Sequence, residues 1–159
     1  MLEAAKAKGY NVALVTTSRV THATPASYSA HINDRDLEND IASQQLGNYV
    51  LGRQLDLLWG GGLRHFTNGT GTKRTDGRDL VAEARAANWS TVLTRADFDA
   101  LNKGKNVKFP SLGLFTLSHM SYEIDRNNTA EPSLTEMSIA ALNALKAAGK
   151  PYFIMIEGE

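Results

Sequence analysis

The side chains best suited to chemistry follow two strand-like segments of the sequence. The apolar, β-branched run at residues 11–17 is followed within a few residues by His22 and Thr24. The apolar run at 152–156 is followed directly by Glu157. In an open α/β sheet, ligands bind at the carboxyl ends of the strands, so these side chains are expected at one edge. A hydroxyl and a carboxylate are hard oxygen ligands, and Thr24 and Glu157 therefore form a candidate magnesium pair.

Arg35 adds a candidate ligand for an anion. It lies eleven residues beyond Thr24, and its planar guanidinium has the fork geometry that suits a phosphate. Simpler roles are open: Thr24 precedes a proline and suits a helix cap, and a loop histidine such as His22 is commonly solvated. Arg35 stands among acids with which it can pair. Glu157 must be paired or coordinated if it is buried. These residues indicate a divalent-cation and anion site without naming a reaction.

The composition is that of an ordinary globular chain. Of 159 residues, 42% are hydrophobic and 21% are charged, and 17 basic residues balance 17 acidic ones. This length and composition predict one domain or part of one. The zero net charge gives no sign of a nucleic-acid partner, and the absence of cysteine excludes disulfides and zinc–thiolate sites. No apolar stretch has the length of an export signal or a membrane anchor, so neither is expected in these residues.

Helical and strand-like segments alternate along the chain, which predicts an α/β fold. Strands are expected at 11–17, 54–62, 90–93, 112–115 and 151–157. Helices are expected at 2–8, from Pro25 onward with Thr24 as cap, at 35–52, at 80–87, after Thr94, and from the capping box Ser133–Glu136 to Gly149. The polar stretch 63–78 is expected to be a surface loop. The sheet should be mostly parallel, with helices on both faces.

A series of short blocks, in a fixed order, carries a family resemblance. The strand and turn VTTSRVTHATPASYSAH is followed by LDLLWGGGLRHF, DGRDLV, LGLF, YEIDR, PSLTEM and YFIMIEG. These blocks resemble the alkaline phosphatase family, and the fungal vacuolar type in particular through YVLGRQLDLLWGGGLRHF. The resemblance covers essentially all 159 residues. It implies that residues 1–159 are the central segment of a single alkaline phosphatase catalytic domain, incomplete at both ends.

The resemblance also implies an activity and roles for particular residues. It implies hydrolysis of phosphate monoesters through a phosphoserine intermediate, with magnesium and zinc as cofactors. Thr24 and Glu157 match magnesium ligands of the family, Arg35 matches its phosphate-binding arginine, and His22 matches a residue that borders both sites. A homodimer and a location at the vacuolar membrane or in the secretory pathway are implied for the complete enzyme.

Several residues of the family pattern have no counterpart in this sequence. The serine nucleophile lies upstream of the matched region and most zinc ligands lie downstream, so the chain alone is expected to be inactive. Thr116 follows GLF where animal members have an acid at their calcium site, and Glu159 replaces the small residue that usually follows EG. The alternative is a non-catalytic module that binds metal or phosphate. The THATPA and LWGGG blocks disfavour a related phosphomutase or sulfatase.

Overall fold

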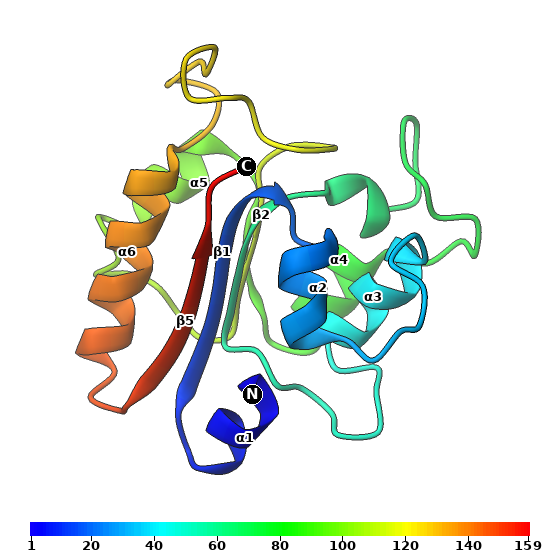
Figure 1. Ribbon diagram of the computed structural model, residues 1–159. Coiled ribbons are helices and arrows are strands. Elements are labelled where there is room, and N and C mark those ends of the chain that lie inside the picture. The colour runs from blue at the N-terminus through cyan, green and yellow to red at the C-terminus, as the bar shows by residue number, and fades with distance from the viewer.

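A parallel five-stranded sheet forms the centre of the molecule (Figure 1). The computed structural model describes residues 1–159. The strands are β1 (Asn11–Arg19), β2 (Leu57–Gly61), β3 (Ser90–Val92), β4 (Ser111–Leu114) and β5 (Tyr152–Glu157). They pair in the order β3-β4-β2-β1-β5, and every pair is parallel. In the register of β1 and β5, Thr16 lies opposite Glu157, so the polar ends of these two strands meet.

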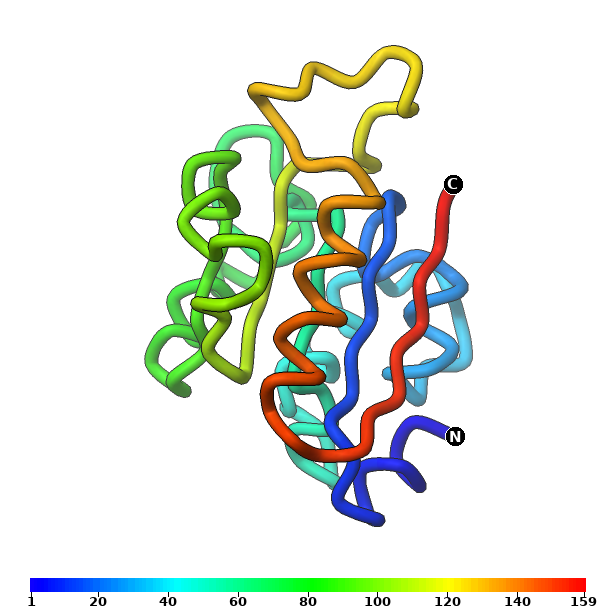
Figure 2. The backbone as a smooth tube through the Cα atoms, turned by 90° about the vertical axis from the view of Figure 1, so that its left-hand side faces the viewer, coloured from blue at the N-terminus to red at the C-terminus, as the bar shows by residue number.

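Helices cover both faces of the sheet, which confirms the predicted α/β class. One face carries α1 (Leu2–Ala7), α2 (Ala23–Ser29), α3 (Glu38–Gln45) and α4 (Leu80–Ala86), and the other carries α5 (Arg95–Ala100) and α6 (Leu134–Ala147). Successive residues of β1 point to opposite faces, so Val12 and Leu14 join one core and Ala13 and Val15 join the other. Figure 2 shows β1 and β5 running side by side, with α6 alongside them. None of the helices has the length and apolar composition needed to cross a bilayer.

Local sequence signals account for most element boundaries. Ser133 and Glu136 form the predicted capping box at the start of α6, and Thr94 and Asp97 form one at α5. The helix predicted at 35–52 is wrong in length, because α3 ends at Gln45 and Gly47 adopts a left-handed φ of 101°.

The prediction that Thr24 caps α2 is wrong. The helix begins at Ala23, and His22 is the extended N-cap residue, whose carbonyl accepts the first helical hydrogen bond from Ala26 N. Thr24 and Pro25 therefore lie within the first turn, where Pro25 is tolerated because first-turn N–H groups have no intrahelical partner. Since the cap is elsewhere, the Thr24 side chain is not committed to closing the helix.

The segment 63–78 is less of a surface loop than its composition predicts. It contains the 3-10 helix η1 (Leu63–His65), and the side chains of His65, Phe66 and Arg74 are buried. Arg74 Nη1 donates to the carbonyl oxygens of His65 and Asn39, each at 3.0 Å. The bond to Asn39 fastens the segment to α3, and the bond to His65 joins two parts of the segment itself.

Candidate active site

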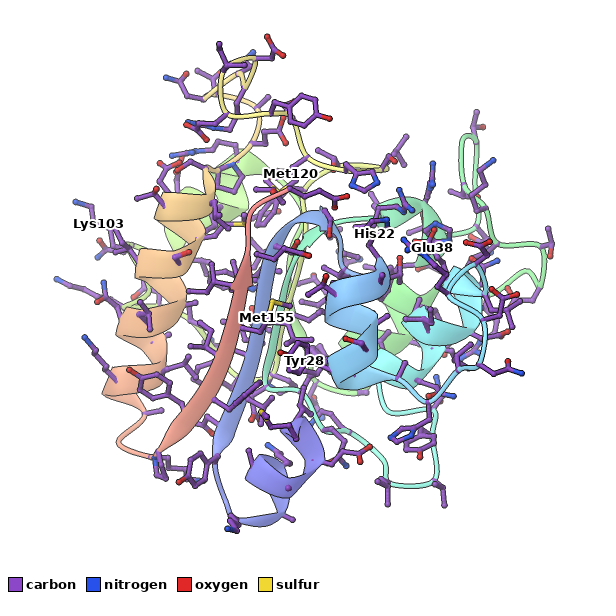
Figure 3. All side chains as sticks on the ribbon, in the orientation of Figure 1. His22, Tyr28, Glu38, Lys103, Met120 and Met155 are labelled. Atoms are coloured by element: carbon purple, nitrogen blue, oxygen red, sulfur yellow. The ribbon has the colours of Figure 1, made fainter.

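Polar side chains from several segments gather at the carboxyl edge of the sheet. They come from the end of β1, the start of α2, the loop between α2 and α3, the start of α3, the loop after β4 and the end of β5. In Figure 3 the labelled residues His22, Glu38 and Met120 lie at this end of the molecule. This is the edge at which the sequence places its candidate ligands.

Glu157 is half-buried and is held by two hydroxyl groups of β1. Thr16 Oγ1 donates to Glu157 Oε2 at 2.8 Å, and Ser18 Oγ lies 3.2 Å from the same oxygen. Thr16 and Ser18 are both fully buried and, two residues apart on a strand, share one face. The other carboxylate oxygen, Oε1, accepts no hydrogen bond from the chain. Glu157 is therefore oriented through one oxygen, which leaves the second for a ligand.

Thr24 lies in the first turn of α2 with its side chain exposed. Its carbonyl oxygen accepts a hydrogen bond from Ser27 Oγ at 2.8 Å, but its hydroxyl forms none. The free hydroxyl of Thr24 and the free oxygen of Glu157 are both hard donors, and their chemistry fits magnesium. No direct contact joins the two residues, so their pairing as metal ligands stays a prediction.

Arg35 and His22 are brought together, as their proposed shared role requires. Arg35 Nη2 lies 2.9 Å from His22 Nε2. Arg35 forms no ion pair with the acids that surround it in the sequence, so the simpler role as a surface ion-pair partner is wrong. His22 Nδ1 lies 3.3 Å from Glu159 Oε2.

His119 joins this group, although the sequence reasoning did not select it. It lies in the loop after β4, and its Nδ1 is 3.3 Å from the same Glu159 oxygen that His22 approaches. The two imidazole rings meet edge to face, with centroids 5.0 Å apart. Its position after the carboxyl end of a parallel strand was the signal that could have found it. Burial and the charge of Arg19 lower the pKa of His119.

Arg19 connects this group to a half-buried acid, Glu38. Its Nε and Nη2 donate to the two oxygens of Glu38 at 2.7 and 2.9 Å, and its Nη1 contacts His119 Nε2. Thr21 Oγ1 also donates to Glu38, at 2.5 Å. Burial by itself would raise the pKa of Glu38, but the hydrogen bonds from Arg19 and Thr21 lower it overall. Arg19 therefore holds the loop at this edge.

His65 completes the polar layer beneath Arg19. Its Nδ1 lies 2.9 Å from Asn39 Oδ1, and its Nε2 accepts from Arg64 Nε at 3.1 Å. The same nitrogen is 3.4 Å from Glu38 Oε2. Burial is the main cause that lowers the pKa of His65 to about 4, against an ordinary value of 6.5. The native structure therefore holds His65 as a neutral imidazole.

Acidification is expected to destabilise the fold through His65. Between pH 6.5 and about 4 the unfolded chain binds a proton on this residue and the native chain does not. The free energy of unfolding should therefore fall as the pH is lowered through this range, by about 3 kcal/mol in total from this group. Urea unfolding of the wild type and His65→Gln at pH 7 and 4.5 measures the effect. His31→Gln, at an exposed histidine, is the control; equal pH slopes for the wild type and His65→Gln would contradict the expectation.

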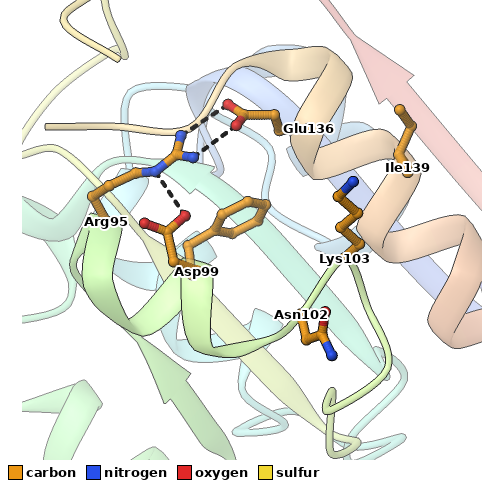
Figure 4. Close-up of a pocket in the computed structure, with 7 residues that line it drawn as sticks. Arg95, Asp99, Asn102, Lys103, Glu136 and Ile139 are labelled. Atoms are coloured by element: carbon orange, nitrogen blue, oxygen red, sulfur yellow. Dashed lines mark hydrogen bonds and ion pairs between the residues drawn. The ribbon is translucent and has the colours of Figure 1, made fainter. Parts of the chain in front are cut away.

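A separate cavity of about 350 Å³ lies between α5 and α6 (Figure 4). Arg95 donates to both oxygens of Glu136, at 2.8 and 2.7 Å, and pairs with Asp99 at 2.9 Å. The hydrogen bonds from Arg95 lower the pKa of Glu136 to about 2. The charged groups of Arg95, Glu136 and Asp99 are thus already paired with one another and are not free to bind a ligand. We therefore place the candidate active site at the carboxyl edge and not in this cavity.

The sequence model of the alkaline phosphatase family matches residues 1–159. The chain belongs to the alkaline phosphatase family. The repressible alkaline phosphatase of Saccharomyces cerevisiae is 45% identical over 174 aligned residues, which cover 99% of this chain and 31% of that protein. The predicted resemblance is therefore confirmed, including the likeness to a fungal form.

Solved alkaline phosphatases share the fold. The crystal structure of the Thermus thermophilus alkaline phosphatase matches with a TM-score of 0.81 and 37% identity, over 98% of this chain and 30% of that one. A histidine-to-glutamate mutant of the alkaline phosphatase from the Antarctic bacterium TAB5, solved with magnesium bound, matches with a TM-score of 0.73 and 29% identity, over 99% of this chain and 41% of that one. The chain thus spans about a third of the length of the alkaline phosphatases that it matches.

Proposed function

We propose that this chain is the magnesium- and phosphate-binding segment of an enzyme that hydrolyses phosphate monoesters. Two observations at the carboxyl edge of the sheet carry the proposal. Glu157 is held through one carboxylate oxygen and keeps the other free, and Arg35 lies within hydrogen-bond distance of His22. The family match over the whole chain supports the same reaction. Residues 1–159 would then be the central segment of one catalytic domain.

Each residue has a distinct task in this proposal. Arg35 binds the non-bridging oxygens of the phosphate and stabilises the charge that develops during transfer. Thr24 and Glu157 hold magnesium, and Thr16 and Ser18 orient the Glu157 carboxylate. Magnesium, when bound, positions a water and lowers its pKa.

The nucleophile and the zinc ligands would come from residues outside these 159. Transfer through a phosphoserine intermediate is part of the proposal, and so are a homodimer and a vacuolar-membrane or secretory location for the complete enzyme.

One group of metal-binding residue types converges within the chain: His22, His119 and Glu159. Both of its histidines face an arginine through Nε2, so this group does not fit zinc as it stands.

An exchange of segments tests the proposal. Residues 1–159 would replace the matching region of the S. cerevisiae repressible alkaline phosphatase, to which they are 45% identical. The chimera is expected to hydrolyse p-nitrophenyl phosphate at alkaline pH with zinc and magnesium supplied, whereas the 159-residue chain alone is expected to give no turnover. A folded, inactive chimera would favour the alternative of a non-catalytic module. Turnover by the chain alone, lost in Thr24→Val, would show that it has its own nucleophile.

Thr16→Val should weaken the binding of magnesium by the chimera. The substitution keeps the volume of the side chain but removes the hydroxyl that donates to Glu157 Oε2. Loss of a residue that orients a metal ligand costs about 10- to 100-fold in metal affinity. A magnesium titration of activity measures the change, and Thr16→Ser, which restores the hydroxyl, should recover most of it. If Thr16→Ser and Thr16→Val behaved alike, the orienting role would be wrong.

A further inference from the structure

The arrangement of His22 and His119 around Glu159 defines a second feature of the site. Each imidazole places its Nδ1 3.3 Å from the same oxygen, Glu159 Oε2. The two rings come from different segments, the start of α2 and the loop after β4, and meet edge to face. A single carboxylate oxygen thus lies between two imidazole nitrogens.

The arginine contacts fix which nitrogen of each ring carries the proton. Arg35 Nη2 faces His22 Nε2, and Arg19 Nη1 faces His119 Nε2. A guanidinium has donors only, so both Nε2 atoms must accept. A neutral imidazole has one acceptor and one donor nitrogen, and both rings therefore carry the proton on Nδ1. In each ring the protonated Nδ1 is then the nitrogen that lies 3.3 Å from Glu159 Oε2, a close electrostatic contact without the geometry of a hydrogen bond.

This proton placement favours an anion over a cation at the position between the rings. A metal ion there would require a lone pair on each Nδ1, which these tautomers do not offer. An anionic oxygen requires donors, and it finds two N–H groups with two guanidinium cations behind them. The converging residue types thus suggest a metal site, but the direction of their hydrogen bonds opposes one.

The backbone around His119 is well fixed. Gly62 N donates to Ser118 O at 2.9 Å, and Met120 N donates to Thr17 O at 2.8 Å. Arg19 is held by both oxygens of Glu38. Arg35 is exposed and its only hydrogen bond is with His22, so its guanidinium is free to turn toward a ligand. His119 and Arg19 are therefore preorganised, and Arg35 is adaptable.

We propose that His22 and His119 form a paired N–H donor site for a phosphate oxyanion, and that the Glu159 carboxylate occupies this site in the unliganded chain. The inference rests on the proposed function for the roles of His22 and Arg35. It adds His119 as a phosphate-binding residue and Glu159 as a competing internal anion. A phosphate oxygen presents the same charge and lone pairs to the two N–H groups as the carboxylate oxygen does.

Titration of the 159-residue chain with inorganic phosphate, followed by calorimetry and by phosphorus NMR, tests the proposal. His119→Ala should raise the Kd for phosphate about tenfold or more, since a hydrogen bond to a charged group is lost. Glu159→Gln should lower that Kd about tenfold, because the competing negative charge is removed. Glu123→Gln, at an exposed acid of the same loop paired with Arg126, is the matched control and should not change it.

Further variants separate a lost donor from a damaged fold. His119→Gln keeps an N–H donor and should retain most of the phosphate affinity, with circular dichroism used to verify folding of every variant. An unchanged Kd in both His119→Ala and Glu159→Gln would overturn the proposal. So would tight zinc binding that is lost in both variants, because it would identify a cation site.

The proposed function and this inference fail in different ways. An inactive chimera beside phosphate binding that depends on His119 would overturn the function and leave the oxyanion site standing. An active chimera beside phosphate affinity that is indifferent to His119 would overturn the oxyanion site alone.

Discussion

Replacing Arg35 with alanine in the chimeric enzyme is expected to lower kcat/KM about 100- to 1000-fold. Removal of one preorganised donor to the developing transition-state charge has an effect of this order. In this structure Arg35 forms no ion pair and its only hydrogen bond is with His22, so no protein carboxylate competes for its guanidinium. The loss should appear mainly in kcat, because the interaction strengthens as charge moves onto the phosphate oxygens.

Steady-state hydrolysis of p-nitrophenyl phosphate measures this effect. Arg53→Ala is the matched control, since Arg53 is an exposed arginine in the loop before β2 and forms no ion pair. Its kcat/KM should equal that of the parent chimera. Equal losses of kcat/KM in Arg35→Ala and Arg53→Ala would point to a general charge effect. A loss of kcat/KM below threefold in Arg35→Ala would show that Arg35 does not bind the phosphate.

Gly61→Ala should destabilise the fold by about 3 kcal/mol, the upper part of the range for overpacking a close-packed site. A Cβ at Gly61 would lie 2.1 Å from Ser118 O and 2.8 Å from Thr116 Oγ1, and the first of these is a backbone atom that cannot simply rotate away. The loop that carries His119 would have to move. The same variant should therefore weaken phosphate binding, if His119 acts as proposed.

Urea unfolding and phosphate titration of Gly61→Ala measure the two effects separately. Gly69→Ala supplies the control, because a Cβ at Gly69 meets no atom within 4 Å and its φ is not in the left-handed region. A Gly61→Ala chain as stable as Gly69→Ala would mean that the loop after β4 adjusts at no cost. Its role as a fixed support for His119 would then be wrong.

The contacts of Arg19 explain why the site depends on residues far from it in the sequence. Arg19 binds Glu38 of α3 on one side and contacts His119 on the other. Glu38 in turn lies 3.4 Å from the buried His65. Protonation of His65 on acidification would therefore place a positive charge beside the acid that holds Arg19.

Short-range patterns in the sequence by themselves determined the elements and the class of the fold. The buried run 11–17 lies within β1, and the capping boxes at Thr94 and Ser133 begin α5 and α6, because each depends on residues a few positions apart. The ordered blocks likewise identified the family, which the match over residues 1–159 confirms. The assigned roles of Thr24, in the first turn of α2, and of Glu157, at the end of β5, remain predictions.

The tertiary structure alone decided which atoms of the site are engaged. Glu157 is bound by Thr16 and Ser18, which lie 141 and 139 residues away, and no local pattern relates them. His119 reaches Glu159 and His22 only because β4, β1 and β5 end at the same edge of the sheet. Such contacts follow from strand order and register, which many distant residues set together through burial. Local propensity fixes where a strand ends, but only the packed sheet fixes what its last side chain meets.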